Sequence, residues 1–146
     1  MMAALIRVSG LVRFTLSSWP SMPWVDAANA DLSRLVAAAA DLCRKPLRHG
    51  VVLTSAPDDE DCSLRLEARS PEGERLVEED LELELYLSGG ELNLTLSWRE
   101  DENRPILWHG NHPVWMGPQG ERCERPLDGL PLEALARRLR ALLAAG

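Results

Sequence analysis

The chain has 146 residues, a formal net charge of −7 and 45% hydrophobic residues. This length predicts one domain that buries about 70% of its unfolded surface. We expect no membrane span, because the sequence has no run of about 20 apolar residues. The three cysteines are an odd number without C-x-x-C spacing, which favours free thiols in a reducing, cytoplasmic setting.

Negative charge is concentrated in the middle of the chain. Residues 57–102 carry 16 acidic and 4 basic side chains. An acidic surface disfavours binding to nucleic acid or to an anionic membrane. Two interpretations remain open: a solvated sheet face that keeps the protein in solution, or a docking surface for a basic partner that includes Glu82 and Glu84.

Residues 1–21 form an N-terminal extension that allows two interpretations. Arg7 and Arg13 interrupt its apolar run, which argues against a signal peptide. The segment fits an edge strand, or a stretch ahead of a native start at Met22. We therefore predict a single α+β domain over residues 22–146.

The first predicted helix begins near Asp26, whose carboxylate can cap the first turn. Its apolar positions fall within one arc of the helical wheel and comprise Ala28, Leu32, Leu35, Val36, Ala39, Leu42 and Cys43. Arg44 falls outside this arc, which predicts a solvated side chain. The helix should end near Lys45, because Pro46 restricts the conformation of the residue before it.

Residues 81–98 alternate strictly between apolar and polar side chains, which is typical of two strands with one buried face. Gly89 and Gly90 suit the positive φ angles of a tight hairpin turn. This turn predicts a register with Leu87 opposite Leu92 and Leu81 opposite Trp98. A slip of one residue would expose every leucine, so the register is strongly specified.

Shorter apolar or alternating segments at 51–53, 63–69 and 106–108 extend this hairpin to a predicted antiparallel meander of four to five strands. We expect Arg65 and Arg69 near Glu82 and Glu84 on its wet face. The glycines and prolines of 108–123 predict an irregular segment. Pro131 is a suitable first residue for a second helix. The apolar arc of that helix comprises Leu132, Leu135, Ala136, Leu139, Leu142 and Leu143.

This order predicts an α+β two-layer sandwich with an N-terminal and a C-terminal helix packed on one sheet face. The order resembles cystatin-like or secretion-chaperone-like folds. The alternative is the helix-grip fold, in which a sheet wraps the C-terminal helix around a ligand cavity. Either resemblance implies a fold and leaves the activity open.

The segment 108–116 has the most unusual local composition. It contains Trp108, His109, His112, Trp115 and Met116 within nine residues. H-x-x-H spacing on a loop lacks the further ligands that a zinc site needs, so we predict no metal. Exposed Trp and Met beside His can anchor a partner or ligand. The other interpretation is that both tryptophans close the open end of the sheet and the histidines lie at its rim.

No motif in the sequence predicts catalytic residues or a cofactor. The first functional hypothesis is therefore a non-enzymatic protein-binding module, such as an assembly factor or chaperone-like adaptor. It includes an unidentified protein partner and allows for a homodimer. The second hypothesis is a small-molecule-binding or enzymatic domain with a cavity between the sheet and the C-terminal helix. Leucines on the inward face favour a filled core, and with it the first hypothesis.

Overall fold

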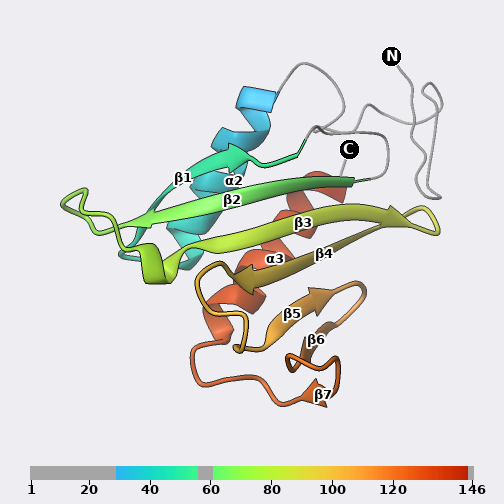
Figure 1. Ribbon diagram of the computed structural model, residues 1–146. Helices are drawn as coiled ribbons and strands as arrows, with labels where there is room; N and C mark the ends of the chain where they lie inside the picture. Colours follow the sequence, from blue (N-terminus) through green and yellow to red (C-terminus); the bar gives the residue numbers. More distant parts are fainter. Residues whose placement is uncertain (1–28, 56–60, 145–146) are drawn as a thin grey trace, which may run out of the picture.

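A computed structural model describes residues 29–55 and 61–144, which form one antiparallel sheet with two helices packed on one of its faces (Figure 1). The helices are α2 (Asn29–Cys43) and α3 (Leu130–Ala144). The strands are β1 (Arg48–Leu53), β2 (Asp61–Arg69), β3 (Leu81–Ser88), β4 (Glu91–Trp98), β5 (Ile106–His109), β6 (Pro113–Met116) and β7 (Arg122–Cys123). A short 3-10 helix, η1 (Val77–Glu79), precedes β3. Asp26 and the extension 1–21 lie outside the described residues.

The strands follow one another in the sheet in chain order, each antiparallel to the next. The predicted β3–β4 hairpin is confirmed to the residue, with Leu81 opposite Trp98 and Leu87 opposite Leu92. Gly89 and Gly90 have φ angles of +62° and +81°, which a two-residue hairpin turn requires. The α+β class, the antiparallel sheet and the two flanking helices are thus confirmed.

The sheet has seven strands within the described residues, more than the predicted four to five. The additional strands β6 and β7 lie in the segment that we expected to be irregular. Pro113 is the first residue of β6, a position where a strand tolerates the missing N–H. A strand of four residues and one of two are too short for alternation to be recognised in the sequence.

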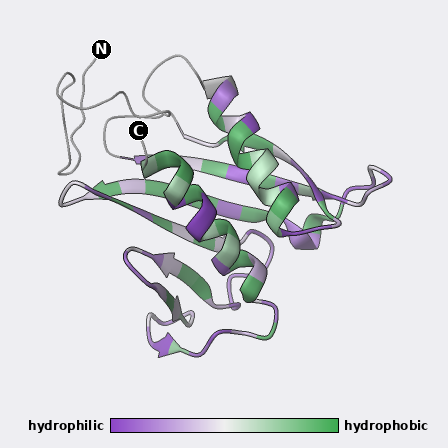
Figure 2. Cartoon of the chain, turned by 180° about the vertical axis from the view of Figure 1, so that it is seen from behind, coloured by the Kyte–Doolittle hydropathy of each residue, from purple (hydrophilic) through white to green (hydrophobic). Residues whose placement is uncertain are grey.

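Both helices cover the same face of the sheet, which we call the inner face (Figure 2). Leucines of β2, β3 and β4 pack there against α2 and α3 in one core. Val36 and Leu139 are fully buried by this packing, as the helical arcs predict. Leu42 and Leu142 belong to the same arcs but are 46% and 43% exposed, so the buried stripe of each helix is narrower than the arc predicted from the sequence.

The opposite face of the sheet, the outer face, has no helix over it in the described residues (Figure 1). Its side chains are the alternate residues of each strand, and most are half-buried or exposed. Arg65 of β2 approaches Glu82 of β3 to 3.4 Å, as expected. Arg69 instead donates to the Gly73 carbonyl of the β2–β3 turn.

Candidate functional site

The β5–β6 hairpin divides the predicted site residues between the two faces of the sheet. Trp108 and Met116 belong to the outer face, whereas His109 and Trp115 belong to the inner face and are buried. His112 lies in the exposed turn between the two strands. Neighbouring strand residues point to opposite sides, so the five residues form no single site.

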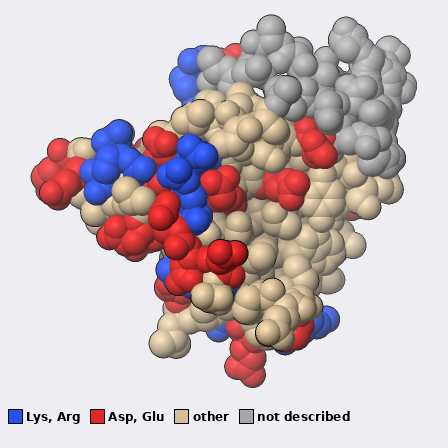
Figure 3. Space-filling view, in the orientation of Figure 1, with Lys and Arg blue, Asp and Glu red and all other residues tan. Residues whose placement is uncertain are grey.

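The outer face carries an uncharged patch over β3 to β6. Trp108 Nε1 donates a hydrogen bond of 2.6 Å to the Tyr86 hydroxyl oxygen, which joins β5 to β3 across β4. The half-buried residues around this pair complete what we call the aromatic patch: Tyr86, Thr95, Ile106, Trp108, Val114 and Met116. Figure 3 shows that charged side chains on this face gather toward the end with the β2–β3 turn, and that much of the remaining surface is uncharged.

The two glutamates predicted for partner binding differ in their surroundings. Glu82 lies 3.4 Å from Arg65 and 3.8 Å from Arg99, so its charge is compensated within the chain. Glu84 is exposed, and its carboxylate has no hydrogen bond or ion pair with any residue that the structure describes. It faces Thr95 on β4, which in turn faces Trp108 on β5.

Trp115 connects the inner face to the start of α3. Its Nε1 donates a 2.7 Å hydrogen bond to a carboxylate oxygen of Glu133, and both residues are buried. Arg125 lies 3.4 Å from the second carboxylate oxygen of Glu133. The surroundings of Trp115 are therefore those of a core residue that positions α3.

His109 lies in the wall of a pocket of about 540 Å³ beside α3. The polar residues that line this pocket are His109, Asn111 and His112 from β5 and its turn, with Arg137 and Arg140 from α3. His109 Nδ1 lies 3.0 Å from the Gly110 carbonyl oxygen, and its buried Nε2 has no partner among the described residues. Burial lowers the pKa of His109, and the positive charges of Arg140 and Arg137 lower it further.

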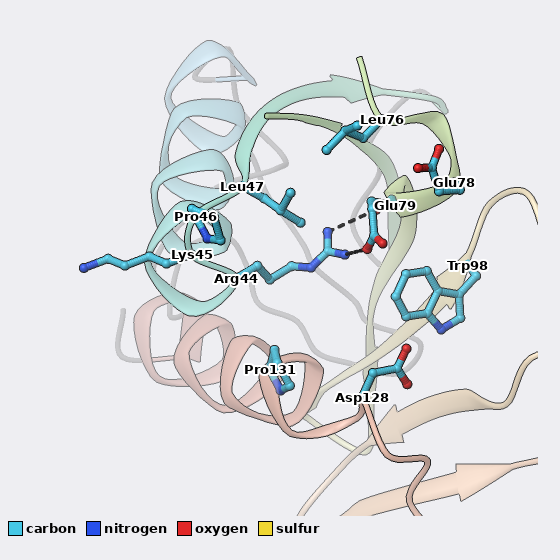
Figure 4. A pocket seen from close by; sticks show the side chains of 10 residues that line it. All are labelled: Arg44, Lys45, Pro46, Leu47, Leu76, Glu78, Glu79, Trp98, Asp128 and Pro131. Carbon is cyan, nitrogen blue, oxygen red and sulfur yellow. Dashed lines mark hydrogen bonds and ion pairs between the residues drawn. The ribbon is translucent and has the colours of Figure 1, made fainter. Parts of the chain in front are cut away.

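A second pocket, of about 340 Å³, lies beside the buried Arg44, although this residue falls outside the apolar arc of the first helix (Figure 4). The side chain of Arg44 is only 4% exposed. It donates hydrogen bonds to the backbone carbonyl oxygen of Glu79 at 3.1 Å and to the Glu79 carboxylate at 3.0 Å. Arg44 also lies 3.0 Å from Nε2 of His49, whose Nδ1 is 2.9 Å from Asp41. Burial lowers the pKa of His49 despite the Asp41 bond.

The ring of Trp98 borders the same pocket and contacts two cations. The guanidinium carbons of Arg104 and Arg44 lie 3.6 Å and 5.6 Å from its centroid. Arg44 thus connects the end of α2 to η1 and β4. Both Nη groups of its guanidinium already have partners within the chain. These contacts depend on segments that are distant in sequence, so no local pattern signals them.

Asp80 is a buried carboxylate at the start of β3. It accepts hydrogen bonds from the Ala68 backbone N–H, from Arg75 and from Arg99, at 2.8 to 3.1 Å. Burial opposes its ionisation, but the bonds from Arg75, Ala68 and Arg99 outweigh burial and hold the pKa of Asp80 below its ordinary value. This cluster fixes the β2–β3 connection and leaves the carboxylate inaccessible.

Within residues 29–55 and 61–144, no group of three His, Cys, Asp or Glu side chains is arranged to hold a metal ion. Over the same residues, no helix has the length and apolar character needed to cross a membrane. The three cysteines differ in exposure: Cys62 is buried, Cys43 half-buried and Cys123 exposed.

Comparison with known proteins found no curated protein and no solved structure that matches the chain. One family does match, over residues 33–142, which include most of α2, every strand and nearly all of α3. The chain therefore belongs to the family described as a domain of unknown function, DUF8659.

Proposed function

We propose that the chain is a non-enzymatic protein-binding module, an adaptor or assembly factor, that binds its partner on the outer face of the sheet. One observation carries the proposal: the aromatic patch lies beside a carboxylate, Glu84, that has no ion pair with the described residues. Aromatic residues are enriched in protein interfaces, and Trp and Tyr dominate their binding energy.

The register places the main contact groups in one row across the sheet. Glu84 faces Thr95, and Thr95 faces Trp108. Adjacent strands lie about 4.8 Å apart, so Glu84 and Trp108 are separated by roughly 10 Å. A single partner segment can therefore contact both residues.

The chemistry of this row defines the partner that we propose. An apolar side chain of the partner packs on the ring of Trp108, beside Tyr86, and a Lys or Arg side chain pairs with Glu84. Tyr86 is already hydrogen-bonded to Trp108, so the pair presents a preorganised surface. The odd number of cysteines, without C-x-x-C spacing, supports a cytoplasmic location for the protein.

The test compares Glu84→Lys with Glu72→Lys, which makes the same charge change in the exposed β2–β3 turn. Both proteins and the wild type are immobilised, exposed to native cell extract and washed, and retained proteins are identified by mass spectrometry. We expect a protein that wild type and Glu72→Lys retain and Glu84→Lys loses. With that protein purified, Glu84→Lys should bind at least about tenfold more weakly, since truncated charge pairs at interfaces cost 2 kcal/mol or more.

Two outcomes would contradict the proposal. In one, every retained protein binds Glu84→Lys as tightly as wild type while circular dichroism shows the variant folded. In the other, sedimentation shows a homodimer that Glu84→Lys dissociates, so that a second copy of the chain occupies the face.

The second functional hypothesis, a ligand cavity between sheet and C-terminal helix, is favoured by a separate observation, the pocket beside α3.

A further inference from the structure

The pocket beside α3 has a charge opposite to that of the protein as a whole. Its polar lining consists of two arginines, two histidines and one asparagine, with no carboxylate among the described residues that line it. The chain has a net charge of −7. We propose that this pocket binds the phosphoryl group of a small phosphomonoester or inorganic phosphate, held between Arg137 and Arg140 of α3 and the β5–β6 turn.

Phosphate fits this lining better than a carboxylate does. A phosphomonoester carries a charge of −1.5 to −2 near neutral pH and three strong acceptor oxygens. Arg137 and Arg140 supply two positive charges and planar sets of N–H donors that bind phosphate bidentately. His112 and Asn111 add donors from the opposite wall. The volume of about 540 Å³ leaves room for a small organic group attached to the phosphoryl group.

The two arginines form only long ion pairs with acidic residues of the chain. Arg137 Nη1 lies 4.0 Å from Glu133 Oε1, whose carboxylate already accepts from Trp115 and faces Arg125. Arg140 lies 3.9 Å from Glu91, a residue whose side chain is 65% exposed. The Nε of Arg140 donates to the Leu92 carbonyl oxygen at 3.0 Å, which fixes the side chain and leaves its Nη groups available.

His109 provides an independent indication that the site is incomplete. His109 is 3% exposed, and its buried Nε2 has no hydrogen-bond partner among the described residues. Nδ1 faces the Gly110 carbonyl oxygen, an acceptor, so Nδ1 carries the proton in this bond. An unpaired buried polar atom destabilises the folded chain. Nε2 is closed off from solvent in this structure, so a protonated phosphate oxygen would donate to it only after the imidazole ring shifts toward the pocket.

The experiment is a titration of the isotopically labelled full chain with inorganic phosphate, followed by NMR at constant ionic strength with chloride as the replaced anion. We expect saturable shifts at His109, His112 and the C-terminal half of α3. Arg137→Gln should weaken binding about tenfold, because a hydrogen bond to a charged group contributes about 1.5–3 kcal/mol. Arg138→Gln is the matched control, because Arg138 is exposed on the same helix and does not line the pocket.

Three results would overturn the proposal: shifts that do not saturate, equal weakening by Arg137→Gln and Arg138→Gln, or acetate that binds as tightly as phosphate. A second arm uses phenyl phosphate and phosphoserine as probes. Tighter binding of either than of inorganic phosphate identifies a phosphomonoester ligand, and equal or weaker binding identifies free phosphate. Glu84→Lys should bind phosphate like the wild type, so failure here and failure of partner binding on the outer face are separate results.

Discussion

Replacing Asp80 with Asn should destabilise the protein more than any comparable change on the sheet surface. The Asp80 side chain is fully buried and accepts hydrogen bonds from Ala68, Arg75 and Arg99. Removing one partner of a buried ion pair costs 3–5 kcal/mol. Arg75 and Arg99 are 28% and 31% exposed, so water can solvate them after the change. We therefore expect a loss near the lower limit, about 3 kcal/mol.

The matched control is Glu82→Gln, which removes a half-buried carboxylate that also lies near Arg99. Exposed ion pairs contribute about 0.2–1 kcal/mol, so this variant should lose at most about 1 kcal/mol. The free energy of unfolding is measured by urea denaturation followed by circular dichroism. If Asp80→Asn and Glu82→Gln lose equal stability, the buried cluster does not fix the β2–β3 connection and the reasoning fails.

The same cluster predicts an acid dependence. Because the pKa of Asp80 is lower in the folded state than in the unfolded chain, the stabilisation is present above an unfolded pKa of about 3.9. It is lost as the pH falls through the folded pKa. Below pH 4 the free energy of unfolding of Asp80→Asn should therefore fall less steeply with pH than that of the wild type. Parallel curves would contradict the assignment.

Three further predictions concern the Arg44 cluster and the thiols. Arg44→Met should lower the free energy of unfolding by about 2 kcal/mol, as measured by urea denaturation, because buried hydrogen bonds to a charged group contribute about 1.5–3 kcal/mol. Arg48 is 68% exposed, so the control Arg48→Met should lose under about 1 kcal/mol. Equal losses would show that the burial of Arg44 does not contribute to stability. The pKa of His49 is lowered in the folded state, so the unfolded chain binds more protons and stability should fall as the pH drops below about 6.5. His49→Gln should make stability depend less steeply on pH in this range. An unchanged slope would show that another group causes the pH dependence. Cys123 should react with a thiol reagent at once and Cys62 only on unfolding; fast reaction of Cys62 would contradict its burial.

The alternation of residues 81–98 was sufficient to predict a complete hairpin, because a one-residue slip would expose the whole leucine face. The helices were predictable for the same reason, since each buries one apolar stripe against that face. Strands β6 and β7 were missed because they have four and two residues and begin among prolines and glycines. They form by pairing in series, β6 with β5 and β7 with β6, and local sequence does not encode these contacts.

The functional residues were predictable only in part. The composition of 108–116 directs attention to the β5–β6 hairpin, but it suggests one cluster, whereas the alternation of side chains along each strand places these residues on two opposite faces. Arg137 and Arg140 lie outside the apolar arc of the second helix, and no sequence pattern shows that they line the pocket beside α3, which we now call the basic pocket, because that depends on which strand turn α3 approaches. Arg44 was misplaced for a related reason: its partners Glu79 and Trp98 are 35 and 54 positions away.

The hairpin geometry also decides how function should be tested. Trp108 and His109 are neighbours in β5, yet one belongs to the aromatic patch and the other to the basic pocket. A substitution at either residue can shift the shared backbone and so alter both faces. Glu84 on β3 and Arg137 on α3 belong to one site each and lie outside the hairpin. Sites without shared partners have nearly additive effects, so the double variant Glu84→Lys, Arg137→Gln should lose partner binding and phosphate binding independently, each by the amount seen in the single variant.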